Sequence, residues 1–393
     1  MHGVVDQGTA RLRYFMDFDY VVAPTIILLI GMVVIWLSLR RMLSLSARFS
    51  KKWRRVTERI ALSVVVLLAG VVAGSASFNA IARLWFRARH PSPGAIYIVD
   101  GYKMHIDCTG SGSPTIVLDA GLGNDAVTWE VVQPELARTT RVCAYDRAGF
   151  GLSQARPAPR DADHIADELH GLLLQAKVTG PIVLMGHSIA GIYIRDYATH
   201  YPQDVAGMVF VDGSTPMQQE NPAIKAMMGK GPPPWVVVVA KAAFIVGVPR
   251  LMGRCSPRAP GLDAHDARLQ GEDFCGMHVQ APLAEFDSMD RSGLETVHTG
   301  PYGALPILIF SHDPAKTLAT ENASERTAEP VWSQMQEDLK KLSTRSRRII
   351  AQGSSHYIQT DRPDLIESEV PPFIQQVRGV APPPANYGST STE

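Results

Sequence analysis

One serine of this 393-residue chain stands where its hydroxyl could act as a nucleophile. The apolar run Pro181–Met185 is typical of a buried strand and leads into GHSIAG, residues 186–191, after which a helical segment begins. A serine on so sharp a strand-to-helix turn is held clear of the sheet with its hydroxyl exposed. Gly186 and Ala190, two positions before and after it, are small enough to relieve the crowding, although glycine is usual at the second position. We therefore predict that Ser188 is a nucleophile.

Three further loops follow predicted strands and extend this pattern. The motif LDAGLGN (118–124) follows the third strand, YDRAGFGLS (145–153) the fourth, and GSSHYIQTDRP (353–363) the last. Together with GHSIAG, these motifs resemble the α/β-hydrolase superfamily over roughly residues 93 to 380. The resemblance implies an enzyme similar to serine esterases and lipases.

The resemblance assigns the general base to His356, in the loop after the last strand. A serine hydroxyl is a poor nucleophile at neutral pH and needs a base to remove its proton. His356 would take the proton of Ser188 and later deliver it to the leaving group. His187 is next to the serine, but a residue at that position is usually structural. The other histidines are interpreted as surface or packing residues.

An aspartate must orient His356, and the order Ser, Asp, His along the chain leaves two candidates. Asp313, in FSHDP after the seventh strand, is at the commoner family position, although the spacing there is one residue short. Asp212, in VDG at the end of the sixth strand, is where a minority of the superfamily carries its acid; it could instead be a loop or helix-cap aspartate. We predict Asp313, with Asp212 as the alternative. Asp146 and Arg147 are expected to be a structural pair beside the site.

Acyl transfer also needs fixed donors for a negative oxygen. The backbone N–H groups of Ile189, after the nucleophile, and Leu122, in the loop after the third strand, fit this oxyanion-hole role best. The glycines around Leu122 do not complete the G-x-G-x-x-G pattern of a dinucleotide loop, and no Cys/His pair has metal-ligand spacing. We expect neither a cofactor nor a metal.

The elements that must position these residues alternate between strand and helix. Short apolar runs recur at 96–99, 103–107, 115–118, 141–145, 181–185, 206–211, 306–310 and 348–351, and helical patterns cover 163–175, 192–201 and 364–377. This alternation predicts an α/β fold with a mostly parallel eight-stranded sheet and helices on both faces. Residues 93–213 and 301–380 would form this core, 214–300 an inserted helical cap, and 381–393 a disordered tail.

The chain begins with two uncharged apolar stretches, residues 20–39 and 60–80. Each is long enough to cross a bilayer as a helix, so 20–82 is predicted to be a transmembrane hairpin after the N-terminal segment 1–19. Residues 40–59 contain eight Lys/Arg and one acid, which places this loop in the cytoplasm by the positive-inside rule. Both termini and the catalytic domain would then be extracytoplasmic. Signal cleavage after the second stretch, at GSASFNA, stays as an alternative.

Four cysteines are too few for a disulfide scaffold. Cys255 and Cys275 both fall in the cap, where an oxidising compartment would permit a bridge. Cys108 and Cys143 lie on predicted strands and are expected to be buried thiols.

Composition excludes some classes of function. The 38 basic residues balance the 38 acidic ones, so no global field attracts nucleic acid. The charged share of 19% is low and fits a chain partly in lipid.

We predict a membrane-anchored serine hydrolase that cleaves carboxylic or lipid-like esters through an acyl-Ser188 intermediate. Thioesterase, amidase, acyltransferase or haloperoxidase activity, or a non-catalytic binding module, are the alternatives; dehalogenase and epoxide-hydrolase chemistry would need an Asp nucleophile.

Overall fold

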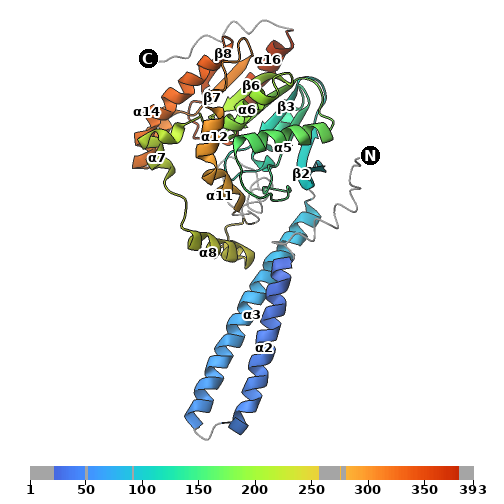
Figure 1. The fold of residues 1–393 in the computed structure, drawn as a ribbon, viewed down its shortest axis with the longest axis vertical. Coiled ribbons are helices and arrows are strands. Elements are labelled where there is room, and N and C mark those ends of the chain that lie inside the picture. The colour runs from blue at the N-terminus through green and yellow to red at the C-terminus, as the bar shows by residue number, and fades with distance from the viewer. Residues whose placement is uncertain (1–21, 49–51, 91–92, 256–274, 276–279, 380–393) are drawn as a thin grey trace. The chain divides into compact units, whose positions relative to one another are not determined.

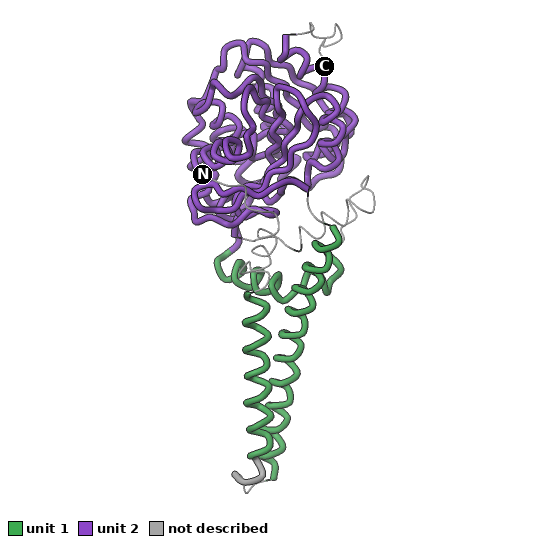
Figure 2. Tube along the Cα trace, turned by 90° about the vertical axis from the view of Figure 1, so that its right-hand side faces the viewer, with its two compact units in different colours: residues 1–92, 233–257, 270–277 green, residues 93–232, 258–269, 278–393 purple. Residues whose placement is uncertain are grey.

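The computed structural model describes residues 22–48, 52–90, 93–255, 275 and 280–379. The chain divides into two units (Figure 2). The hairpin unit comprises residues 1–92, 233–257 and 270–277, and the sheet unit comprises residues 93–232, 258–269 and 278–393. The N-terminal segment 1–19 lies outside the described residues, and so does the segment 381–393, which we predicted to be a disordered tail.

An eight-stranded sheet forms the centre of the sheet unit (Figure 1). Its order is β1-β2-β4-β3-β5-β6-β7-β8. The β1–β2 and β2–β4 pairs are antiparallel and every other pair is parallel, which confirms the predicted fold class. The strands are β1 (Ala95–Val99), β2 (Tyr102–Thr109), β3 (Thr115–Asp119), β4 (Val142–Tyr145), β5 (Ile182–His187), β6 (Val205–Val211), β7 (Ile307–Ser311) and β8 (Ser346–Ile350).

Helices cover both faces of the sheet because its central strands are apolar on both sides. Every residue of β3, β4, β5 and β7 is buried, as expected for parallel strands between two helical layers. One face packs on α5 (Ala162–Gln175), α6 (Ala190–His200) and η4 (Leu339–Leu342). The other packs on η2 (Ala126–Trp129), α4 (Gln133–Leu136), α15 (Ile358–Asp361) and α16 (Pro363–Arg378).

The predicted cap, residues 214–300, is divided between the two units. Its helices η3 (Gln218–Glu220), α7 (Pro222–Met228), α11 (Gln280–Asp287) and α12 (Met289–Thr296) belong to the sheet unit, as do α13 (Pro314–Thr320) and α14 (Ala323–Asp338) after β7. The cap helices α8 (Pro234–Ile245) and α9 (Val248–Leu251) belong to the hairpin unit. The insertion is therefore not one body packed on the sheet.

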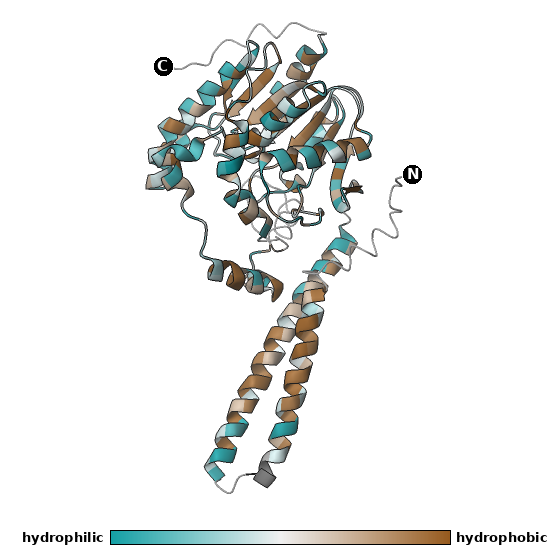
Figure 3. Ribbon diagram, in the orientation of Figure 1, coloured by the Kyte–Doolittle hydropathy of each residue, from teal (hydrophilic) through white to brown (hydrophobic). Residues whose placement is uncertain are grey.

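Two long helices, α2 (Ala23–Arg48) and α3 (Lys52–Arg89), pack against each other in the hairpin unit. A Cβ at Gly31 of α2 would lie 2.9 Å from the Cβ of Ala73 of α3, so glycine permits a close approach there. Helix α2 continues beyond the end of the predicted stretch 20–39, and α3 extends beyond 60–80 at both ends. Both helices are long and apolar enough to cross a membrane. Their apolar side chains are mostly exposed, and most of both ribbons has the brown of hydrophobic residues in Figure 3.

The described residues contain two disulfides. Cys255 is joined to Cys275, the bridge that the sequence left open. Cys108 is joined to Cys143, so our expectation of two buried thiols was wrong. These two cysteines face each other in the antiparallel β2–β4 pair, with their Cα atoms 4.0 Å apart. Nothing in the sequence shows that β2 pairs with β4 instead of β3, which is why the bridge was missed.

Candidate functional site

Ser188 lies on the turn between β5 and α6, as predicted. Its φ of 55° is in the left-handed region, a strained conformation for serine that lifts its side chain off the end of the strand. A Cβ at Gly186 would lie 2.9 Å from the carbonyl of Ala190 and 3.1 Å from its methyl group. The glycine before the nucleophile thus provides the room that allows alanine at the position where glycine is usual.

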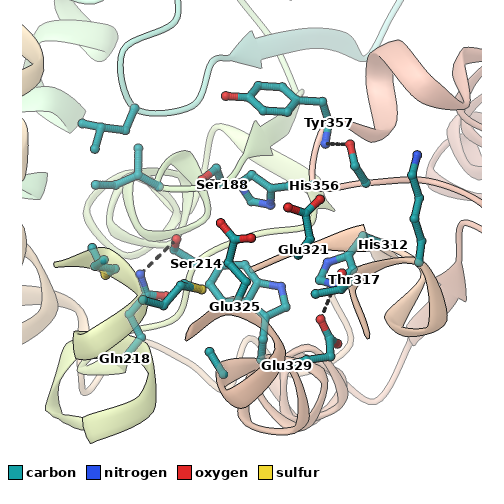
Figure 4. A pocket seen from close by; sticks show the side chains of 18 of the residues that line it. Ser188, Ser214, Gln218, His312, Thr317, Glu321, Glu325, Glu329, His356 and Tyr357 are labelled. Carbon is teal, nitrogen blue, oxygen red and sulfur yellow. Dashed lines mark hydrogen bonds and ion pairs between the residues drawn. The ribbon is translucent and has the colours of Figure 1, made fainter. Parts of the chain in front are cut away.

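His356, in the loop between β8 and α15, reaches the serine. Its Nε2 lies 2.9 Å from Ser188 Oγ, and its Nδ1 lies 2.6 Å from Asp212 Oδ2. The two residues that we predicted as nucleophile and base are therefore brought together, and Figure 4 shows them side by side. The geometry allows the hydroxyl proton to pass to Nε2 while the carboxylate holds the other side of the ring.

The aspartate beside His356 is the alternative candidate, Asp212, and not Asp313. Asp212 follows β6 and is completely buried. Asp313 instead caps α13, accepting a hydrogen bond from the N–H of Ala315 at 2.9 Å, and it also accepts one from the N–H of Gly353 at 2.8 Å. The preference for Asp313 was therefore wrong in geometry, because its carboxylate caps α13 while that of Asp212 is bound to His356 Nδ1.

A second histidine shares the buried carboxylate, and it was not predicted to do so. His312 Nδ1 lies 2.7 Å from Asp212 Oδ2, and its Nε2 lies 2.7 Å from Glu329 Oε2 on α14. The indole N–H of Trp332 donates to Asp212 Oδ1 at 3.1 Å. We had interpreted His312 as a surface or packing residue. Its place directly after β7, beside a candidate acid, was the only available signal.

These contacts fix the charges behind His356. Burial alone would raise the pKa of Asp212, but the charge and hydrogen bond of His312 and the hydrogen bond of His356 hold it well below its ordinary value. Burial alone would lower the pKa of His312, but Asp212 and Glu329 together raise it to about 10. At neutral pH the site therefore contains a carboxylate and an imidazolium behind Ser188 and His356.

Asp212, His312 and His356 also offer three atoms close enough together to hold a metal ion. In this structure hydrogen bonds account for the cluster, because Asp212 Oδ2 accepts from both imidazole rings. The donor atoms that would face a metal are thus already paired with each other.

The loop after β3 is held in place by Arg147. Its guanidinium donates to the carbonyl oxygens of Ala120 and Gly121, at 2.5 and 2.9 Å, directly before Leu122. It also pairs with Asp119 at 2.6 Å and, through two bonds of 2.7 and 2.9 Å, with Glu285 of α11. A buried charge with this many partners is well compensated. Arg147 therefore ties the proposed oxyanion loop to a cap helix.

Asp146, the neighbour of Arg147, has other partners, so the expected pair does not form. It lies 2.8 Å from His105 Nδ1 and accepts hydrogen bonds from the N–H groups of Ala126 and Leu152. His187 has the structural place expected of it: a Cβ at Gly121 would lie 2.7 Å from its Nδ1. Burial and the nearby His356 lower the pKa of His187 to about 3, so it packs as a neutral ring.

A cavity of about 410 Å³ opens at Ser188 and is also lined by both proposed oxyanion residues, Leu122 and Ile189. This volume is in the range of small-molecule sites. Part of the lining is apolar and consists of Met227, Met228 and Met289. Another part carries carboxylates at and before α14, Glu321, Glu325 and Glu329, of which the first two project into the space in Figure 4.

Comparison with known proteins agrees with the fold and the motifs. Residues 116–369 match the model of the alpha/beta hydrolase family, and the chain belongs to this family. It is 27% identical over 272 residues to the uncharacterized protein YqjL of Bacillus subtilis (strain 168), covering 69% of this chain and 87% of that protein.

Two further likenesses concern parts of the chain. The uncharacterized vacuolar membrane protein YNL115C of Saccharomyces cerevisiae is 28% identical over 151 residues, which cover 33% of this chain and 23% of that protein. Epoxide hydrolase A from Mycobacterium thermoresistibile has a similar structure, with a TM-score of 0.54 over 72% of this chain and 98% of that one. At 19% identity this second likeness concerns the fold alone.

Proposed function

We propose that the protein is a membrane-anchored serine hydrolase that cleaves carboxylic esters through an acyl-Ser188 intermediate. The observation that carries the proposal is the continuous series of contacts from Ser188 Oγ through His356 to the buried carboxylate of Asp212, at the wall of a cavity. A binding module with this fold would not need hydrogen bonds between these three side chains.

The reaction follows from this geometry. His356 Nε2 takes the proton of Ser188 as its Oγ attacks the ester carbonyl, and Asp212 stabilises the imidazolium that forms. The N–H groups of Leu122 and Ile189 receive the negative oxygen of the tetrahedral intermediate. His356 then protonates the leaving alcohol as the C–O bond breaks. Water, deprotonated by His356, releases the acid and restores Ser188.

The cavity and the anchor support an ester of an apolar or lipid-like acid. Three methionines give the cavity a soft apolar wall that adapts to alkyl chains. Thioesters, amides and transfer to another acceptor fit the same residues, so they are the alternatives within this class. Epoxide hydrolysis, the activity named for a structural neighbour, would need a carboxylate where Ser188 stands.

We further propose that α2 and α3 cross the cell membrane with the basic segment 40–59 in the cytoplasm and the sheet unit outside. The apolar surfaces of both helices and the vacuolar membrane relative support a membrane location. Two disulfides support an oxidising compartment for the domains that carry them.

Labelling with a fluorophosphonate probe tests the central step. Membranes containing the wild-type chain should be labelled, and Ser188→Ala should not be, while Ser368→Ala, which removes an exposed hydroxyl on α16, should match the wild type. Hydrolysis of a short-chain p-nitrophenyl ester should fall on the order of 100,000-fold in Ser188→Ala. A folded wild-type protein that neither labels nor hydrolyses esters would refute the proposal.

A further inference from the structure

Helix α8 is the most apolar helix of the cap, and no residue of it is buried. Its most exposed side chains follow a helical stripe: Trp235, Val238, Val239 and Ala242. Trp235 and Val238 are 68% and 69% exposed, and Leu251 and Met252 at the end of α9 are similarly uncovered. Spacings of three and four residues place the stripe on one face of α8. Most of the α8 ribbon has the brown of hydrophobic residues in Figure 3.

The other observation concerns how α8 ends. Its last carbonyl groups are bound by polar side chains of α3, within the hairpin unit. Asn79 Nδ2 donates to the carbonyl oxygens of Phe244 and Ile245 at 3.0 and 3.3 Å, and Ser75 Oγ donates to that of Val246 at 2.5 Å. Carbonyl groups at a helix end have no partner within the helix, and in water they need none from the protein. In lipid, where no water can bind them, unpaired carbonyl groups are strongly unfavourable.

The contact between α3 and the α8–α9 turn is close. Asn79 is buried, and a Cβ at Gly247, where φ is 78°, would lie 2.6 Å from its Cβ. Arg250 Nε donates to Asn79 Oδ1 at 2.9 Å. Ser75 and Asn79 lie in the last part of the apolar run 60–80, about two turns and one turn before Arg83. The contact therefore fixes α8 at the level where α3 changes from apolar to basic.

We propose that α8 and α9 form a third membrane-binding element, whose exposed stripe lies in the boundary between headgroups and acyl chains of the bilayer that the hairpin crosses. The inference rests on the proposed membrane anchor. The stripe is apolar and exposed, like the surface of α3, and α8 is hydrogen-bonded to α3. Tryptophan and long basic side chains around it are typical of helices that lie at this depth.

The element also has a covalent link to the active site. Met227 and Met228 line the catalytic cavity at the end of α7, and only residues 229–233 separate them from α8. If α8 is bound to the membrane, this short connection keeps Met227 and Met228, which form one wall of the cavity, close to the lipid surface. An apolar ester would be found at that surface.

The test is a depth measurement on the full chain in phosphatidylcholine vesicles. Single cysteines replace Val238 on α8, Leu67 in the middle of α3, and Leu174 on α5 of the sheet unit, and each carries an environment-sensitive fluorophore. Leu67 and Leu174 are exposed by 66% and 59%, which matches them to Val238. We expect the Val238→Cys probe to be quenched most by lipids with a nitroxide near the headgroup, Leu67→Cys by nitroxides deep in the chains, and Leu174→Cys by neither.

Each other outcome has a distinct meaning. A Val238→Cys probe that behaves like Leu174→Cys, while Leu67→Cys is quenched, overturns the third element and leaves the anchor intact. A probe at 238 that is shielded from water but unquenched by either lipid means that protein covers the stripe, which also overturns it. If Leu67→Cys is unquenched too, the proposed anchor itself fails.

Discussion

At the scale of single residues, the unusual group is Asp212, because one carboxylate accepts hydrogen bonds from two imidazole rings and an indole. We predict that Asp212→Asn lowers kcat for ester hydrolysis by about 10,000-fold, since the amide can no longer hold His356 in its productive tautomer. Asp313→Asn is the matched control and should stay within a few-fold of the wild type. Steady-state kinetics of the two variants decide which aspartate serves as the acid, and equal losses in both would contradict the assignment.

His312 gives a second residue-scale prediction, for stability. Its pKa is raised from 6.5 to about 10 in the folded protein, so its stabilising contribution is complete below pH 6.5 and is lost as pH rises to about 10. The melting temperature of the wild type in detergent should therefore fall between pH 7 and pH 10 more steeply than that of His312→Asn. Replacing the exposed His298 by Asn should leave the wild-type slope unchanged; parallel curves for all three proteins would rule out the buried imidazolium.

The sequence was sufficient to predict that Ser188 and His356 meet, because each lies in a local motif whose neighbours must be small or must form a tight loop. It was insufficient for the acid. The choice between Asp212 and Asp313 depends on which strand end faces His356, and on whether a side chain is used instead to begin a helix. Asp212 contacts His312, which follows β7, and Trp332 of α14, and His312 in turn contacts Glu329 of α14. These contacts depend on the tertiary structure, so no local sequence pattern predicts them.

At the scale of elements, the oxyanion loop depends on a cap helix through Arg147. We predict that Glu285→Gln lowers kcat by roughly 10- to 100-fold with a smaller change in KM, because losing the whole function of an oxyanion donor costs about 100- to 1,000-fold and the loop would only loosen. Glu295→Gln, which removes a carboxylate from the exposed Arg291, should have kcat within two-fold of the wild type. A loss confined to KM would indicate that Glu285 shapes the cavity only.

The strands and main helices could be predicted because both faces of the sheet are buried, which makes the strands continuous apolar runs between amphipathic helices. The cap could not be predicted in the same way. Its length indicated an insertion, but α8 and α11 look alike as short helices while their partners lie in different units. Asn79 and Glu285, the residues that make those attachments, carry no sign of their partners in the sequence.

At the scale of the whole molecule, the balance of charge around the two apolar helices predicts the orientation in the membrane. In spheroplasts, a membrane-impermeant maleimide should label Leu174→Cys on the sheet unit at once, and should label Ser44→Cys at the basic end of α2 only after lysis. Both side chains are exposed, so accessibility within the protein does not differ. Immediate labelling of Ser44→Cys with protection of Leu174→Cys would reverse the proposed topology.

The bridge between Cys108 and Cys143 has a mechanical consequence. The chain leaves α3 at Arg89 and enters the sheet through the edge strand β1 and then its neighbour β2, so a force applied to α3 would act first on these two antiparallel strands. The hydrogen bonds that hold an edge strand to its neighbour can break one after another. At Cys108 that peeling would meet a covalent bond to β4. A force passing along the chain from α3 would therefore be transferred to β4 through this disulfide before β2 could separate from β4.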